Sequence, residues 1–234
     1  MTTGFRRTCC GIMVAMLFYH LHGSTGFSEE ITDAEPVSAE IAQEDILPLT
    51  LGTVTIDYYD GKLPEQPAVS NSLAEMTEEE LLDAAGDIYR GTVESLRTIE
   101  IRNGERTDYK TLAEISVAEV YKGGFAPGDT VTIYINDPIL SENVWIEDYD
   151  VLYQMRENMD GIFMTQAGED IYTVVGGEKI YLNTFADGRF QDGTRFAILA
   201  VEDGLEFARD CYEEPLRSAQ TLEKAGEYLK QKIQ

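Results

Sequence analysis

The sequence predicts a mainly β protein: an antiparallel β-barrel over residues 73–207, with a short helix at its start and a carboxyl-terminal helix within residues 208–234. Short runs that alternate apolar and polar residues recur along the chain, which is the period of half-buried strands. Pairs such as Asn103-Gly104 and Gly176-Gly177 separate these runs and favour tight turns. Helical spacing of apolar residues is confined to two short stretches.

Residues 1–28 have the order of a secretory signal peptide. Arg6 and Arg7 precede an uncharged, mostly apolar run at residues 9–19, and small residues including Ser28 end the segment. The run is shorter than the ~20 apolar residues that a membrane-spanning helix needs. We therefore expect cleavage after Ser28 and a secreted, extracytoplasmic protein without a membrane anchor. Retention of the segment as an anchor is the alternative.

The segments between the signal and the barrel differ in composition. Residues 29–45 are acidic and lack aromatic residues, which predicts a flexible linker. Residues 46–72 are the lead-in to the barrel. Their first part, residues 46–59, is rich in β-branched residues and predicts a strand, while residues 60–72 contain Gly, Asn and two Pro and predict a loop.

A short helix is predicted to begin at Thr77. The Thr77 hydroxyl can accept a hydrogen bond from the Glu80 amide while the Glu80 carboxylate reaches back, which is a capping box. Leu81 and Leu82 give the helix an apolar side, and Gly86 is expected to end it.

Two long strands are predicted at residues 87–101 and 109–121, and a third at residues 130–136. Gly91 lies inside the first, where it predicts a bulge or a sharp bend. The apolar residues of the second change phase before Val120, which a bulge also produces.

The second half of the chain predicts more strands and a final helix. Residues 139–160 are expected to form a long excursion with one short strand or helical turn. Strands follow at residues 161–166, 171–175, 179–184 and 194–201. Pro215 suits the first turn of the last helix, and its apolar face is lined by Leu222, Ala225, Leu229 and Ile233.

The stretch Leu81 to Ile135 carries a family resemblance. It places G-T-V in a strand from Gly91, V-Y-K-G at a strand end from Val120 and G-D-T-V before a third strand from Gly128. In these features it resembles the secreted bacterial OB-fold domains of the netrin and tissue-inhibitor-of-metalloproteinase type. The resemblance implies an OB-like barrel. It does not imply zinc-directed inhibition, which needs an amino-terminal cysteine held by disulfides, because the mature chain would keep only Cys211.

Composition excludes several classes of function. The chain has 43 Asp and Glu against 18 Lys and Arg, a net charge of −25, so nucleic acid and anionic lipid are disfavoured partners. Both histidines, His20 and His22, lie in the expected signal peptide. The mature chain therefore lacks a histidine base and a His and Cys zinc site. We predict no cofactor and no catalytic residues.

Two groups of residues are candidate binding sites. Aromatic side chains that can stack on a glycan or a partner protein gather at Tyr134, Trp145, Tyr149 and Tyr153. Their alternative role is core packing. Oxygen ligands suited to Ca²⁺ gather at Glu142, Glu147, Asp148 and Asp150. Their spacing does not follow the EF-hand loop, which makes them weak candidates beside a solvated acidic loop.

The function predicted from the sequence is therefore a secreted, monomeric and non-catalytic binding module for an extracellular protein or a glycan. A carboxylate-based enzyme acting on glycosides is one alternative, because such an enzyme needs two carboxylates and no histidine. A calcium-binding module is the other.

Overall fold

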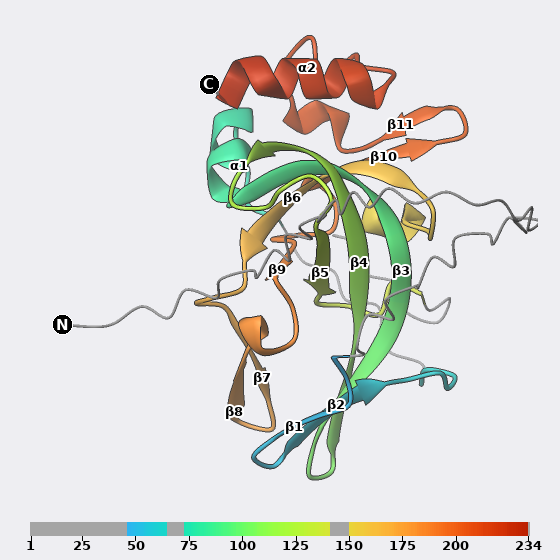
Figure 1. Ribbon diagram of the computed structural model, residues 1–234, viewed down its shortest axis with the longest axis vertical. Coiled ribbons are helices and arrows are strands. Elements are labelled where there is room, and N and C mark those ends of the chain that lie inside the picture. Colours follow the sequence, from blue (N-terminus) through green and yellow to red (C-terminus); the bar gives the residue numbers. More distant parts are fainter. Residues whose placement is uncertain (1–45, 65–72, 141–149, 234) are drawn as a thin grey trace, which may run out of the picture. The chain divides into compact units, whose positions relative to one another are not determined.

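A computed structural model describes residues 46–64, 73–140 and 150–233 of the chain. The predicted signal peptide and acidic linker lie outside these residues. In the described part, strands form one nine-stranded and one two-stranded sheet, and the chain has two α-helices (Figure 1). The prediction of a mainly β protein with a carboxyl-terminal helix is confirmed.

The first strands form a hairpin, β1 (Leu49–Leu51) and β2 (Val54–Tyr58). The prediction of one continuous strand here was wrong. Gly52 has a φ of +62°, a conformation that glycine adopts without a steric penalty, and it turns the chain. Strand β2 then pairs with the end of β3 (Asp87–Asn103).

Helix α1 (Glu78–Ala84) confirms the predicted capping box. The Glu80 amide donates to Thr77 Oγ1 at 3.2 Å, and the Thr77 amide donates to Glu80 Oε2 at 2.8 Å. These two bonds satisfy amides that have no partner inside the first helical turn. Leu81 and Leu82 are buried, as the pattern predicts.

Strands β3 and β4 (Arg106–Lys122) form a long curved antiparallel pair (Figure 1). Its register shifts between Arg90 and Gly91, where Ala118 of β4 has no partner residue. Both predicted irregularities are therefore confirmed. A Cβ atom at Gly91 would collide with the Ser116 carbonyl oxygen, so this close approach requires glycine.

Three further strands join this pair. Strand β5 (Thr130–Ile135) pairs with β4, and β6 (Asp160–Ala167) pairs with β3, both antiparallel. Strand β9 (Gly188–Arg189) runs parallel to β5 and antiparallel to β6. The parallel pair corrects the prediction of a wholly antiparallel sheet. The sequence analysis did not predict β9, because a strand of two residues is too short to show a period.

Two hairpins complete the strands. Strands β10 (Ala197–Val201) and β11 (Gly204–Glu206) extend the large sheet beyond β6. Strands β7 (Tyr172–Val175) and β8 (Glu178–Tyr181) form the separate two-stranded sheet. The strand predicted at residues 179–184 is shorter, because a 3₁₀ turn follows at Leu182–Thr184.

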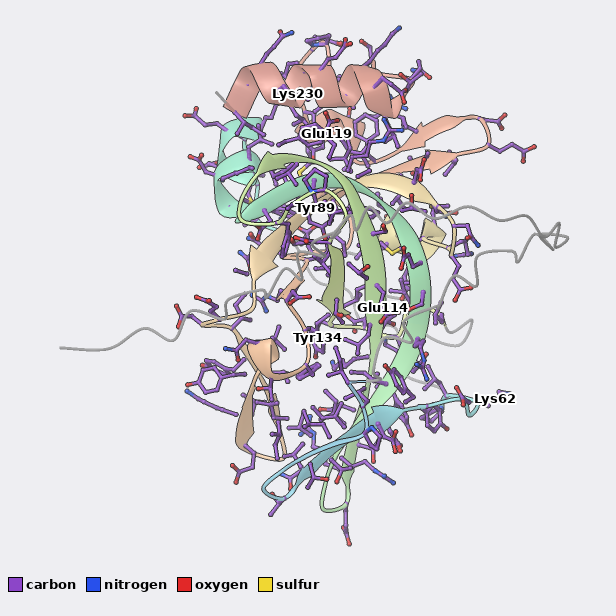
Figure 2. The ribbon with its side chains drawn as sticks, in the orientation of Figure 1. Lys62, Tyr89, Glu114, Glu119, Tyr134 and Lys230 are labelled. Atoms are coloured by element: carbon purple, nitrogen blue, oxygen red, sulfur yellow. The ribbon has the colours of Figure 1, made fainter. Side chains whose placement is uncertain are left out.

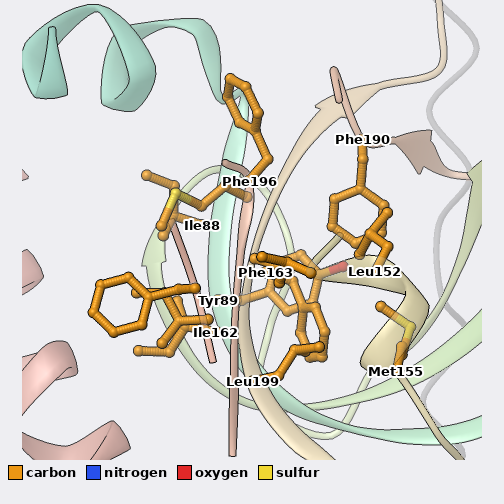
Figure 3. Packing of buried hydrophobic residues seen from close by; sticks show 14 of the residues in the cluster. Ile88, Tyr89, Leu152, Met155, Ile162, Phe163, Phe190, Phe196 and Leu199 are labelled. Atoms are coloured by element: carbon orange, nitrogen blue, oxygen red, sulfur yellow. The ribbon is translucent and has the colours of Figure 1, made fainter. Parts of the chain in front are cut away.

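Buried side chains form two clusters. The larger one surrounds Phe163, whose ring lies 5.9 Å from that of Tyr89 and 6.3 Å from that of Phe190 (Figure 3). The smaller one contains Ile99 and Ile101 of β3, with residues of β1–β2 and β7–β8 packed around them. Apolar burial on this scale is what holds a fold without disulfides together.

Helix α2 (Leu222–Ile233) packs on β4 and β6 of the same chain. The expected start at Pro215 was wrong, since turns occupy the residues before Leu222. Leu222, Ala225 and Leu229 are buried as predicted. An ion pair of 2.5 Å between Lys230 and Glu119 ties the helix to β4 (Figure 2). No helix in the described part of the chain is long and apolar enough to cross a membrane.

Candidate recognition surface

Of the four predicted aromatic candidates, the structure describes Tyr134 and Tyr153. Tyr134 is only 2% exposed and packs in the smaller cluster, with its ring 5.8 Å from that of Phe185 (Figure 2). Burial raises the pKa of its phenol above the ordinary value. Tyr153 is half-buried against the larger cluster. Trp145 and Tyr149 lie outside the described residues. For Tyr134, core packing therefore replaces the expected role in binding.

The predicted calcium ligands fall mostly outside the described part of the chain. Glu142, Glu147 and Asp148 are among the residues not described, while Asp150 is exposed. Within residues 46–64, 73–140 and 150–233, no group of three or more His, Cys, Asp or Glu side chains could hold a metal ion.

Exposed apolar side chains gather instead on the β7–β8 hairpin. Tyr172, Val174 and Tyr181 are 43%, 49% and 50% exposed. The other large apolar side chains exposed in the described residues are Ile46 and Leu140. Contiguous exposed apolar surface commonly marks a site of interaction.

The strand register explains why these side chains lie together. Tyr172 is opposite Tyr181 and Val174 is opposite Lys179, so all four point to one face. We call this set, Tyr172, Val174, Lys179 and Tyr181, the hairpin face. The alternate residues Val175 and Ile180 point the other way and are buried in the smaller cluster.

The two tyrosines and the lysine of the hairpin face contact one another. The rings of Tyr172 and Tyr181 lie 6.0 Å apart at 67°, an edge-to-face contact that aromatic rings favour. The Lys179 ammonium lies 4.2 Å from the centre of the Tyr172 ring, within the range of a cation–π interaction. The face is therefore a surface of aromatic, aliphatic and cationic groups.

Polar contacts fix the hairpin to the rest of the fold. The Asn103 side-chain amide donates to the Val175 carbonyl at 3.0 Å. The Tyr134 phenol of β5 donates to Thr173 Oγ1 of β7 at 3.5 Å, and the Leu182 amide closes the base of the hairpin itself by donating to the Ile171 carbonyl at 2.9 Å. Together with the buried Val175 and Ile180, these bonds hold the face in place before any partner arrives, which lowers the entropic cost of binding.

A cluster of polar side chains lies at a hollow of about 600 Å³ between α2 and the loop before it. The Glu78 carboxylate, 3% exposed, accepts from Tyr228 Oη at 2.5 Å and from the Glu213 amide at 2.7 Å. Lys232 Nζ lies 3.5 Å from Glu78 and 2.9 Å from Glu213. Because these groups satisfy one another, we interpret the cluster as a junction that joins α1 to α2.

The Tyr228 to Glu78 bond makes a testable contribution to stability. Burial and this hydrogen bond raise the pKa of Tyr228 from 10.0 to about 12. The neutral phenol is thus favoured in the folded state, so its contribution is present below pH 10 and is lost as the pH rises through about 12. We expect Tyr228→Phe to lower the free energy of unfolding by about 1 kcal/mol at pH 8.

Urea denaturation of the wild type and of Tyr228→Phe between pH 8 and 11.5 checks this expectation. The difference between the two proteins should shrink as the pH passes 10. A difference that stays constant over this range would show that the phenol proton of Tyr228 makes no contribution.

Cys211 is the only cysteine among the described residues. It is free and half-buried, and burial raises the pKa of its thiol. A raised pKa leaves less of the nucleophilic thiolate at neutral pH.

Sequence reasoning missed the hairpin face for a definable reason. Residues 171–181 read IYTVVGGEKIY, and the alternation predicts two strands and a turn. Apolar residues occupy both faces of this hairpin, so periodicity does not tell which face packs on the core. The symmetric placement of Tyr172 and Tyr181 about Gly176-Gly177 was the available signal.

Comparison of the chain with protein-family models, with curated proteins and with solved structures gives no match.

Proposed function

We propose that this protein is a secreted, non-catalytic recognition module that binds a partner protein through the hairpin face. The observation that carries the proposal is the gathering of Tyr172, Val174 and Tyr181, each more than 40% exposed, on one anchored hairpin. Exposure of these apolar side chains to water is unfavourable in free energy, and their burial against a partner would remove that penalty.

The composition of the face favours a protein over a glycan. Sugar rings stack on flat aromatic platforms, whereas the rings of Tyr172 and Tyr181 are inclined at 67°. Val174 lies beside them on the same face. Tyrosine combined with aliphatic side chains and few charges is typical of the centre of a protein interface.

The proposal includes an OB-like, partly closed barrel as the scaffold of the hairpin. Pairings that lead from β3 through β4, β5 and β9 to β6, and from β6 to β3, support it. Strand β9 contributes only two residues. A five-stranded, partly open barrel is the general form of the OB fold.

The charge and the amino-terminal segment support the extracellular setting. A net charge of −25 keeps a protein soluble and disfavours nucleic acid. Residues 1–28 have the pattern of an export signal. The exclusion of histidine chemistry from the mature chain supports recognition without catalysis.

Site-specific photocrosslinking tests the proposal. Benzoylphenylalanine is placed at Tyr172, at Tyr181 and, as a control, at the exposed Glu202 in the turn between β10 and β11, far from the hairpin (Figure 1). Each protein is irradiated in a culture of the cells that produce it. We expect one protein adduct shared by Tyr172 and Tyr181 and absent at Glu202, and an excess of wild-type protein should compete for it. Equal labelling at all three positions, or none at the hairpin, would contradict the proposal.

A further inference from the structure

Among the described strands, none pairs with the outer backbone edge of β8, which lies next to the hairpin face. In the described sheets, β8 pairs with β7 alone. Strand β7 contacts β3 and β4, and Figure 1 shows β8 on the side of the hairpin away from them. A free strand edge is a template for pairing with another strand.

The register identifies the backbone groups on that edge. The two-residue turn places Val175 opposite Glu178, and the Leu182 amide donates to the Ile171 carbonyl. In an antiparallel pair, residues bonded to each other alternate with residues whose N–H and C=O groups point outward. Lys179 and Tyr181 are the outward residues of β8, and their side chains belong to the hairpin face.

The negative charge near the hairpin favours a partner segment with basic residues. Glu169 and Asp170, which precede β7, and Glu178, the first residue of β8, are exposed, and the whole chain carries −25. A second copy of the chain would bring the same negative charges together, which opposes self-association.

Resting on the proposed function, we infer that the partner presents an extended segment in which basic and apolar residues alternate, and that this segment adds to β8 as a third, antiparallel strand. Residues opposite Lys179 and Tyr181 share the hairpin face, because paired residues point to the same side. Apolar side chains of the segment pack there. The alternate lysines or arginines point to the opposite side, where Glu178 lies.

Four synthetic peptides test the inference by fluorescence anisotropy on the full chain. The first alternates lysine with valine over seven residues, and the second replaces lysine with glutamate. The third and fourth are the basic peptide N-methylated on its valine amides or on its lysine amides. Only the valine amides face β8 in the inferred pairing, so we expect methylation there to weaken binding at least tenfold. Methylation of the lysine amides should change binding less than about threefold.

Protein variants separate the site from diffuse charge attraction. Tyr181→Ala is expected to weaken binding of the basic peptide about tenfold. Glu178→Lys should weaken it more than Glu202→Lys, which makes the same charge change at an exposed position in the turn between β10 and β11, far from the hairpin. Equal effects of the two lysine variants, equal binding of all basic peptides, or a Tyr181-dependent dimer in sedimentation would overturn the inference.

The photocrosslinking experiment and the peptide-binding experiment test different claims, so one can give a negative result without the other. A hairpin-specific crosslink without peptide binding would keep the hairpin face as the site and reject strand addition. Peptide binding that follows the pattern above without any crosslink would keep the strand edge as a binding site and reject the proposed partner protein in the producing culture.

Discussion

Replacing Arg195 with methionine is expected to lower the free energy of unfolding by about 3–5 kcal/mol, because it leaves the Asp192 carboxylate buried without its cation. Arg195 and Asp192 are 7% and 5% exposed. Arg195 Nη2 and Nε lie 2.7 Å and 2.9 Å from Asp192 Oδ2. A third bond, from Arg195 Nη1 to the Ala74 carbonyl at 2.7 Å, is lost as well. Methionine keeps much of the volume of the arginine side chain, so the change in the free energy of unfolding arises chiefly from loss of the positive charge.

Urea denaturation of Arg195→Met measures this effect, and Arg106→Met is the matched control. Arg106 pairs with Asp108 at 3.5 Å, but its side chain is 63% exposed. Surface pairs contribute about 1 kcal/mol or less. The double variant Asp192→Leu with Arg195→Met should recover part of the loss, since it removes both buried charges. Equal effects of Arg195→Met and Arg106→Met would show that burial does not govern the Asp192 pair.

Replacing Phe163 with alanine is expected to cost about 3–5 kcal/mol of stability. Phe163 is fully buried, and its ring contacts those of Tyr89 and Phe190 (Figure 3). It lies in β6, which pairs with β3, β9 and β10. Alanine would remove apolar surface from the centre of the larger cluster and leave a cavity that these strands cannot easily close.

Thermal and urea unfolding of Phe163→Ala and Tyr172→Ala test the contrast between core and hairpin face. Both changes remove an aromatic ring, but Tyr172 is 43% exposed and its loss should cost less than about 1 kcal/mol. A loss at Tyr172 as large as that at Phe163 would mean that the hairpin face serves stability, and would weaken the proposed role in recognition.

Local signals in the sequence predicted local structure well. Thr77 and Glu80 encode their own helix start, because the capping box lies within four residues of chain. Gly91 predicted a bulge because glycine inside a strand often marks a close backbone approach. The structure gives the reason, since any larger residue at this position would collide with the β4 backbone. The start of α2 was misplaced, because Pro215 is compatible with a first helical turn but equally with the turns that occupy it.

Features that depend on distant partners were beyond the sequence. Strand β9 is defined by its pairing with β5 and β6, which lie more than twenty residues away. Tyr134 and Tyr172 are both strand tyrosines in alternating segments, yet one is 2% and the other 43% exposed. Which face of a strand is covered depends on the other layers of the fold and is not encoded in the strand's own period.

The long β3 strand makes the two core clusters a single cooperative system. Val93 and Leu96 belong to the larger cluster, while Ile99 and Ile101 of the same strand belong to the smaller one. Opening either cluster frees part of a strand on which the other depends, so both are expected to melt together. If a partner binds at the hairpin as proposed, its binding energy would stabilise the whole described body, and it would protect α1 and α2 against unfolding as much as the strands it touches.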